Sequence, residues 1–211
     1  MADNYLEKRY EACFGSQRTK VRRIGPTFDD LLLRNRSTRG YYKDFVVSLD
    51  QLEQVVSVYS RVPSARNQQP LRFRLVTRDS GAEKVLPLLT LGAALPELHL
   101  PLKGTEPEAF IVVCSSTVEN RMVDIDLGIA AQSMLLKATS MGLNGLIVAA
   151  FNRQALREVL HLPFEPLLVI AIGKSAENIQ LVPSSAEAPR AYYREGDVHY
   201  VPKLQLHEYL I

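Results

Sequence analysis

Three arginines and two hydroxyl side chains are concentrated in one short segment, Arg34-Asn35-Arg36-Ser37-Thr38-Arg39-Gly40. Guanidinium groups form bidentate, charge-assisted hydrogen bonds with phosphates, and a hydroxyl can serve a remaining acceptor. This composition suits the binding of a phosphate group. An ordinary exposed basic loop has the same composition, and considered alone the segment favours that plainer interpretation.

A second polar segment, Pro63-Ser64-Ala65-Arg66-Asn67-Gln68-Gln69-Pro70, lies between an expected helix and an expected strand. Amide side chains offer hydrogen-bond donors and acceptors together. The uracil-like edge of a flavin requires that combination, because its carbonyls accept while its N3–H donates. A plain polar loop is an equally good interpretation of this segment by itself.

The usual side-chain catalysts are missing from the sequence. It contains no glycine-rich dinucleotide fingerprint, no P-loop, no GxSxG and no HExxH. The four histidines are scattered, and Cys13 and Cys114 are too far apart in sequence to suggest a metal site. We therefore expect no metal ligands and no catalytic side chain, so that a cofactor would carry any reaction.

Composition and charge exclude several classes of protein. The chain has 211 residues, 46% hydrophobic and 23% charged, as in an ordinary globular domain. Its net charge of +2 is spread along the chain, which does not suggest nucleic-acid binding. No apolar stretch reaches the ~20 residues of a membrane helix, and the polar N-terminus does not resemble a signal peptide. We expect a cytoplasmic protein that does not bind membranes.

Hydrophobic periodicity predicts the elements that hold the two polar segments. A capping box at 48–51 opens a helix that Pro63 closes. The other expected helices are 2–13, 28–33, 80–89 with an interruption at Pro87, 120–141 and 152–160. The expected strands are 71–76, 109–115, 146–148 and 167–172. Residues 90–108 form a Gly/Pro-rich loop, and past residue 175 we expect a polar tail that is either disordered or laid across a partner.

The helix expected at 120–141 is apolar around nearly its whole circumference in its middle. A helix with this pattern must be buried on all sides. A second subunit packed on it would bury it, and a central position under the chain's own sheet would do so equally well.

Several motifs, in this order, resemble the FMN-dependent nitroreductase family. The chain has Arg36-Ser37-Thr38-Arg39, then the 63–70 segment, then Asp126-Leu127-Gly128-Ile129-Ala130-Ala131-Gln132-Ser133-Met134-Leu135-Leu136-Lys137-Ala138 with Met141-Gly142-Leu143. The segments 156–163, 170–173 and 190–200 are also similar to late parts of the family pattern. The likeness covers roughly residues 28 to 202, and the ordered set overturns the plain-loop interpretations.

The resemblance implies an α+β fold with a central four- to five-stranded mixed or antiparallel sheet flanked by helices in three layers. It implies an intertwined homodimer with two FMN sites between the subunits. Residues 1–25 would form an N-terminal helical arm and residues 26–211 the FMN-binding domain, with the tail from about 178 wrapping the partner.

The resemblance also assigns FMN contacts to particular residues. Arg36, Ser37 and Arg39 would hold the phosphate and ribityl end. The turn would reach the FMN of the facing subunit through Pro63, Ser64, Ala65, Asn67 and Gln69. The backbone of Ala149 and Ala150 would approach flavin N5, and Arg190 or Arg194 would close on the phosphate.

Two positions depart from the family pattern. Asn35 stands where many relatives carry an additional arginine, so one phosphate contact is lost or supplied by Arg34. Leu71 stands where tryptophan is common, and the sequence has no tryptophan.

The activity implied is hydride transfer from NAD(P)H through FMN to a small organic acceptor, such as a nitroaromatic, a quinone or a flavin, by a ping-pong mechanism. Three alternatives stay open at this point. They are an FMN-binding protein without reductase turnover, a different flavin chemistry on the same scaffold with 90–108 as a lid, and a cofactor-free interaction module.

Overall fold

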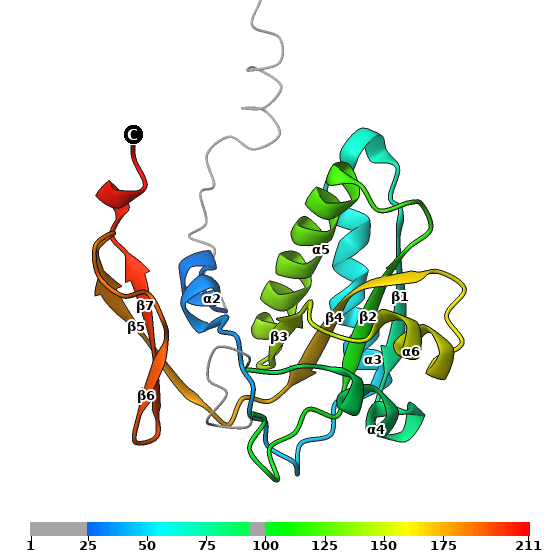
Figure 1. Cartoon of the computed structure of the whole chain (residues 1–211), viewed down its shortest axis with the longest axis horizontal. Coiled ribbons are helices and arrows are strands. Elements are labelled where there is room, and N and C mark those ends of the chain that lie inside the picture. Colours follow the sequence, from blue (N-terminus) through cyan, green and yellow to red (C-terminus); the bar gives the residue numbers. More distant parts are fainter. Residues whose placement is uncertain (1–24, 93–99) are drawn as a thin grey trace, which may run out of the picture.

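A computed structural model describes residues 25–92 and 100–211. The helix expected at 2–13 and the centre of the loop expected at 90–108 lie outside the described residues. The described chain forms a three-layer body and a separate small sheet (Figure 1).

A four-stranded antiparallel sheet forms the centre of the body. Its strands are β1 (Leu71–Val76), β2 (Phe110–Ser115), β3 (Asn144–Val148) and β4 (Glu165–Gly173), in the order β1-β2-β4-β3. The two continuous apolar runs, β2 and β4, occupy the middle, where both faces of a strand are covered. The alternating strand β1 is at one edge and β3 at the other. The predicted α+β class and four strands are confirmed.

Helices cover both faces of this sheet (Figure 1). On one face lie α3 (Leu49–Val56) and α5 (Arg121–Ser140), which pack on Ile111, Val113 and Ile170. On the other lie α4 (Ala82–Val85) and α6 (Arg153–Val159), packed on Phe110, Val112 and Val169. Successive side chains of β2 and β4 point to opposite faces of the sheet, so each strand contributes residues to both hydrophobic cores. A further helix, α2 (Phe28–Arg34), contacts α5.

Capping signals set several helix ends. The predicted Ser48 capping box opens α3, and the helix changes to 3-10 geometry over Ser57–Arg61 before Pro63. Thr27 caps α2 with a similar box, and Asn152 caps α6. The helix expected at 80–89 is broken into short turns, because Pro87 has no amide hydrogen to continue it.

The segment beyond residue 175 differs from the expected polar tail. It forms a three-stranded sheet of β5 (Asn178–Ser184), β6 (Tyr193–Glu195) and β7 (Val198–Leu204), in the order β5-β7-β6. β5 and β7 are parallel, while β6 and β7 form a hairpin around Gly196. Figure 1 shows this sheet standing apart from the body, beyond α2.

The long helix α5 is not buried on all sides by its own chain. Ala130, Met134 and Ala138 are buried against the sheet, whereas Met122 and Ile125 are nearly half exposed. The expectation of all-round burial is therefore not met within one chain. An apolar strip of α5 stays uncovered by the described residues.

Candidate active site

A cavity of about 230 Å³ lies between the segment after α2 and the small C-terminal sheet. We call it the anion cavity. It is lined by Asn35, Arg36, Ser37, Arg39, Ile179, Tyr192, His199, Val201 and Lys203. The predicted phosphate-binding residues Arg36, Ser37 and Arg39 thus share one cavity, and β5 and β7 form its opposite wall.

The side chain of Asn144, the first residue of β3, fixes the start of this segment. Its Oδ1 accepts from the Arg36 amide at 3.2 Å, and its Nδ2 donates to the Arg34 carbonyl at 2.8 Å. The same Oδ1 also accepts from the Gly145 amide at 3.1 Å. The Asn144 side chain therefore satisfies the Arg34 carbonyl and the Arg36 amide, which have no helical partner at the end of α2.

The next residues of this segment pair with the edge strand β3 through a parallel bridge between Ser37 and Gly145. The Thr38 amide donates to the Gly145 carbonyl at 3.1 Å, and Thr38 itself is fully buried. The Tyr41 hydroxyl donates to the Thr38 carbonyl at 2.6 Å. Glycine is required at 145, because an added Cβ would overlap the Ala171 carbonyl and approach Leu135 to 2.8 Å. The backbone of the cavity wall is therefore held on both sides.

Glu177 connects the segment to the C-terminal sheet. Its carboxylate accepts from the Arg39 amide at 2.6 Å and forms an ion pair with Arg194 of β6. Both side chains of that pair are largely buried. The Arg39 guanidinium lies 4.9 Å from the centroid of the Tyr192 ring, a cation–π geometry. These contacts orient Arg39 at the cavity wall.

Unpartnered hydrogen-bonding atoms are concentrated around the anion cavity. Within residues 25–92 and 100–211, buried nitrogens without a partner are Nε of Arg36, Arg39 and Arg194 and Nδ1 of His199. Arg36, Arg39 and His199 all line the cavity. A buried donor without a partner is costly, so these atoms indicate a ligand that accepts hydrogen bonds. Burial lowers the pKa of Arg36, but a guanidinium stays charged at neutral pH.

The polar turn at 63–70 is held by a buried carboxylate of α5. Asp126 accepts from the Ser64 hydroxyl at 2.5 Å and from the Ala65 amide at 2.9 Å. Asn67 and Gln69 both adopt positive φ angles, 54° and 48°, and their side chains are hydrogen bonded to each other at 2.9 Å. The turn is thus rigidly held, with exposed amides available to a ligand.

The turn meets α5 near its start, whereas the segment that lines the anion cavity is anchored beyond its end. Asp126 meets the turn near the start of the helix, and the helix ends at Ser140, four residues before the Asn144 anchor. The helix axis between Asp126 and Ser140 is roughly 20 Å long. The chain therefore does not bring the two predicted segments together within one subunit.

The other predicted contacts are distributed as follows. Ala149 and Ala150 are exposed directly after the edge strand β3, and the Ala150 carbonyl accepts from Thr90 at 2.9 Å. Arg190 is exposed, whereas Arg194 is paired with Glu177. Instead, the C-terminal sheet contributes the cation Lys203 and the imidazole of His199 to the cavity lining. Sequence reasoning missed both, although the Asp197–Tyr200 segment contains His199.

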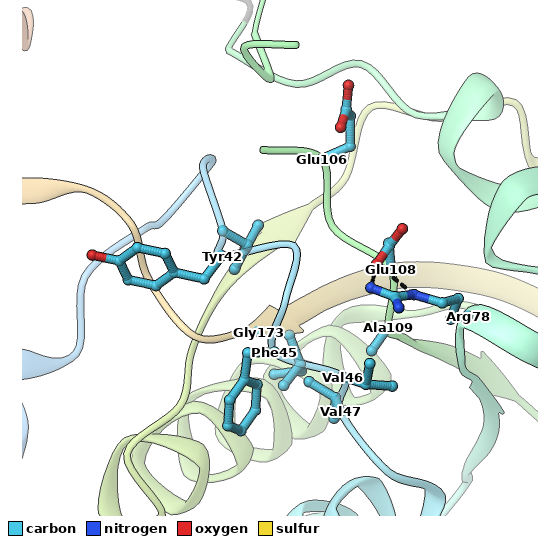
Figure 2. Close-up of a pocket in the computed structure, with 11 residues that line it drawn as sticks. Tyr42, Phe45, Val46, Val47, Arg78, Glu106, Glu108, Ala109 and Gly173 are labelled. Atoms are coloured by element: carbon cyan, nitrogen blue, oxygen red, sulfur yellow. Dashed lines mark hydrogen bonds and ion pairs between the residues drawn. The ribbon is translucent and has the colours of Figure 1, made fainter. Parts of the chain in front are cut away.

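A second hollow lies between the chain after Gly40 and the segment before β2. Figure 2 shows its lining, in which Arg78 is hydrogen bonded to Glu108 below Glu106. Its volume of about 10 Å³ admits at most one water. Lys43 also pairs with Glu108 at 2.7 Å, so the charges there are matched among themselves. This hollow joins segments and offers no ligand site.

Two further features, metal ligation and membrane spanning, concern the described residues as a whole. No group of three or more His, Cys, Asp or Glu side chains among them has the arrangement of a metal site. No helix within 25–92 and 100–211 is both long and apolar enough to span a bilayer.

The comparisons with known proteins agree with this fold. The family model described as "Nitroreductase family" matches residues 32–174, more than half of the chain, so the chain belongs to that family. Both predicted polar segments lie within the matched residues, and the C-terminal sheet follows them. A protein of Archaeoglobus fulgidus, provisionally named as an NADH dehydrogenase/NAD(P)H nitroreductase, is 27% identical over 150 residues, covering 67% of this chain and 80% of that protein.

Solved structures show the same fold. A nitroreductase family protein from Clostridium difficile superimposes with a TM-score of 0.57 at 27% identity, covering 77% of this chain and 90% of that one. A second structure, described as an FMN-dependent nitroreductase from Clostridium difficile, gives a TM-score of 0.58 at 22% identity, with coverages of 70% and 87%. A third, from Exiguobacterium sibiricum, was solved in complex with FMN and gives 0.59 at 17% identity, with coverages of 72% and 90%.

Proposed function

We propose that this protein is an FMN-dependent oxidoreductase that passes hydride from NAD(P)H through bound FMN to a small organic acceptor. The acceptor class is a nitroaromatic, a quinone or a flavin, and the two substrates use the site in turn. Membership of the nitroreductase family supports the oxidoreductase class. The FMN in relatives of the same fold supports the cofactor.

The observation that carries the proposal is the set of unpartnered donors at the anion cavity. The buried Nε atoms of Arg36 and Arg39 have no partner within the described residues. A phosphate monoester bears about −1.5 to −2 charges at neutral pH and presents three acceptor oxygens. These two guanidiniums and the Ser37 hydroxyl match it in charge and in hydrogen-bonding capacity. The residues present therefore fit the phosphate end of FMN.

FMN, when bound, supplies the acceptance and donation of hydride. The chain's own residues bind and orient it. Arg36, Ser37 and Arg39 would hold the phosphate, with Arg190 or Arg194 as the additional cation expected from the family. Backbone groups at Ala149 and Ala150 would face the ring system, and no side chain is required to transfer a proton, since solvent reaches these exposed residues.

We also propose that the working form is a homodimer. The anion cavity and the turn formed by Pro63, Ser64, Ala65, Asn67 and Gln69 are separated along α5, and each would serve a site shared with the other copy. The uncovered residues Met122 and Ile125 of α5 support a partner there. The chain that follows β7 carries the exposed residues Leu206, Tyr209 and Leu210, which supports contact of this end of the chain with the partner.

The first experiment measures FMN affinity by quenching of flavin fluorescence. Replacing Arg36 or Arg39 by alanine removes charged hydrogen bonds, each worth about 1.5–3 kcal/mol, so affinity falls about 10- to 100-fold. The matched control is Lys84→Ala, which removes a charge of the same sign from an exposed position on α4, outside the cavity lining. Unchanged FMN affinity in both cavity variants would contradict the phosphate assignment.

The second experiment tests turnover separately from binding. The FMN-loaded protein is mixed anaerobically with NADH or NADPH, and loss of the absorbance near ~450 nm is followed, as for a reduced flavin. Bleaching followed by recovery on adding a quinone or nitroaromatic is the expected result. A protein that binds FMN without bleaching would be a flavin carrier and would contradict the proposed reductase activity.

A further inference from the structure

His199 of β7 is the most deeply buried polar side chain lining the anion cavity. It is only 2% exposed, and its Nδ1 has no hydrogen-bond partner within the described residues. The Tyr192 ring packs against it at a centroid distance of 5.0 Å. An imidazole nitrogen buried without a partner at a cavity wall is expected to meet a ligand there.

The groups around His199 come from each element packed against it. In the sheet register, Arg194 of β6 is opposite His199 on one side and the apolar Ile179 of β5 on the other. Glu177, which precedes β5, is the nearby anion, and it is paired with Arg194. Arg39 contributes positive charge from the facing segment. Arg36 and Lys203 line the same cavity.

These surroundings favour the neutral imidazole when no ligand is bound. Burial is the main cause that lowers the pKa of His199, and Arg194 and Arg39 lower it further, while Glu177 acts in the opposite direction. A phosphate dianion in the same cavity would reverse the balance, because a nearby negative charge favours the protonated form.

We propose that His199 takes up a proton when a phosphate group binds in the anion cavity and becomes a third cationic ligand beside Arg36 and Arg39. This proposal rests on the proposed function, since it takes the FMN phosphate as the anion. The guanidiniums provide charge that does not change with pH. His199 makes the affinity for the phosphate dependent on pH.

The sign of this dependence follows from linkage. Binding that raises the pKa of His199 takes up a proton between the free and the bound pKa. FMN affinity then falls as pH rises through that interval, by about tenfold for each unit by which binding raises the pKa. The phosphate itself loses its second proton near ~6, so above pH 7 its own charge is nearly constant.

The test measures the FMN dissociation constant between about pH 7 and pH 8.5, where the charge of the phosphate is nearly constant, for the wild-type protein and for His199→Asn. Asparagine keeps a neutral amide donor near the position of Nδ1 but cannot gain a charge. We expect a roughly tenfold loss of affinity across this range in the wild type and a nearly flat profile in the variant. Riboflavin, which lacks the phosphate, is the matched ligand and should give flat profiles with both proteins.

A second measurement does not depend on the variant. Calorimetric titration of wild-type protein with FMN at pH 7.5, in two buffers of different ionisation enthalpy, counts the protons bound. An uptake of roughly half a proton or more per FMN is expected, and it should disappear with riboflavin. No uptake, or the same pH profile in wild type and His199→Asn, would overturn the proposal.

The results separate this inference from the proposed function. If the protein binds no FMN at any pH, the proposed function fails and His199 loses its phosphate ligand with it. If Arg36→Ala weakens FMN binding while proton uptake is absent, the cavity is a phosphate site and only the role of His199 is wrong.

Discussion

At the scale of single residues, the structure separates charges that line the anion cavity from groups that hold those charges in place. Arginine and hydroxyl composition alone favours a plain loop, and the ordered family motifs are needed to assign the phosphate to Arg36, Ser37 and Arg39. All three line one cavity. Glu177 and Asn144 could not be predicted, because each acts on backbone far away in sequence. Such partners carry no local pattern, and only the fold brings them together.

Asn144 is expected to be a positioning residue for the anion cavity. In Asn144→Ala the Arg36 amide and the Arg34 carbonyl lose their partner, at a cost of about 1–3 kcal/mol in the free energy of unfolding. We also expect weaker FMN binding, because the Arg36 backbone is released. Asn152→Ala is the matched control: it removes the cap of α6, costs about 1 kcal/mol, and lies on the other face of the sheet.

Denaturant unfolding gives the stability, and flavin fluorescence gives the affinity. Both variants should be less stable, but only Asn144→Ala should bind FMN more weakly. Equal FMN affinity in the two variants would show that Asn144 supports the fold alone.

Cys114 is expected to be unreactive in the folded protein. Burial raises the pKa of its thiol to about 11, so only about one thiol in a thousand is ionised at pH 8. In a Cys13→Ser variant, a disulfide reagent should react slowly at pH 8 and faster as pH rises toward 11. Rapid labelling comparable to that in denaturant would contradict this burial.

The sign for stability follows from the same shift. The folded pKa is above the unfolded one, so the contribution of the neutral thiol is complete below about 9 and is lost as pH rises toward about 11. Replacement of Cys114 by alanine should remove this part of the alkaline loss of stability.

At the scale of elements, the periodicity of hydrophobic residues predicted most helices and strands of the three-layer body. The strands at 71–76 and 109–115 and the helix at 120–141 agree with β1, β2 and α5 within one or two residues, because their burial is set by local pattern. The C-terminal sheet was missed for a physical reason. β5 and β7 are half-exposed strands with prolines at 183 and 202, and their parallel pairing joins residues about twenty positions apart.

The turn at 63–70 is expected to depend on one carboxylate of α5. The Ser64 hydroxyl and the Ala65 amide both donate hydrogen bonds to the Asp126 carboxylate. In Asp126→Asn one of the two acceptor oxygens is replaced by an NH₂ group, which is itself a donor and cannot accept either bond. Unfolding free energy should fall by about 1–3 kcal/mol, and FMN affinity should fall with it. Asp124→Asn, on an exposed position two residues earlier, is the control and should change neither by as much.

Thermal unfolding and FMN titration of the two variants provide the measurement. An FMN affinity in Asp126→Asn equal to that of the wild type would show that the rigidity of the turn does not matter for FMN binding.

At the scale of the whole molecule, the uncovered strip of α5 supports association of two copies. Ile125→Glu places a charge on this strip, which should be strongly unfavourable at an apolar interface. Analytical ultracentrifugation should give twice the 23.7 kDa chain mass for the wild type and a shift toward the single chain for the variant, with loss of bound FMN. Gln154→Glu adds the same charge to α6 and should leave the mass unchanged.

A wild-type protein that stays a single chain at micromolar concentration while holding FMN would contradict the shared site. It would also require the turn and the anion cavity of one chain to serve different ligands.

The anion cavity is built from two distant stretches of sequence, one at 35–39 and the other at 179–203. A growing polypeptide on the ribosome therefore has half of the lining of the anion cavity long before the other half exists. Loading of the proposed FMN would have to wait until β7 has been synthesised and paired with β5. A nick in the connection between β5 and β6 would open the anion cavity, and with it the proposed flavin site, while leaving the central sheet and both of its cores intact.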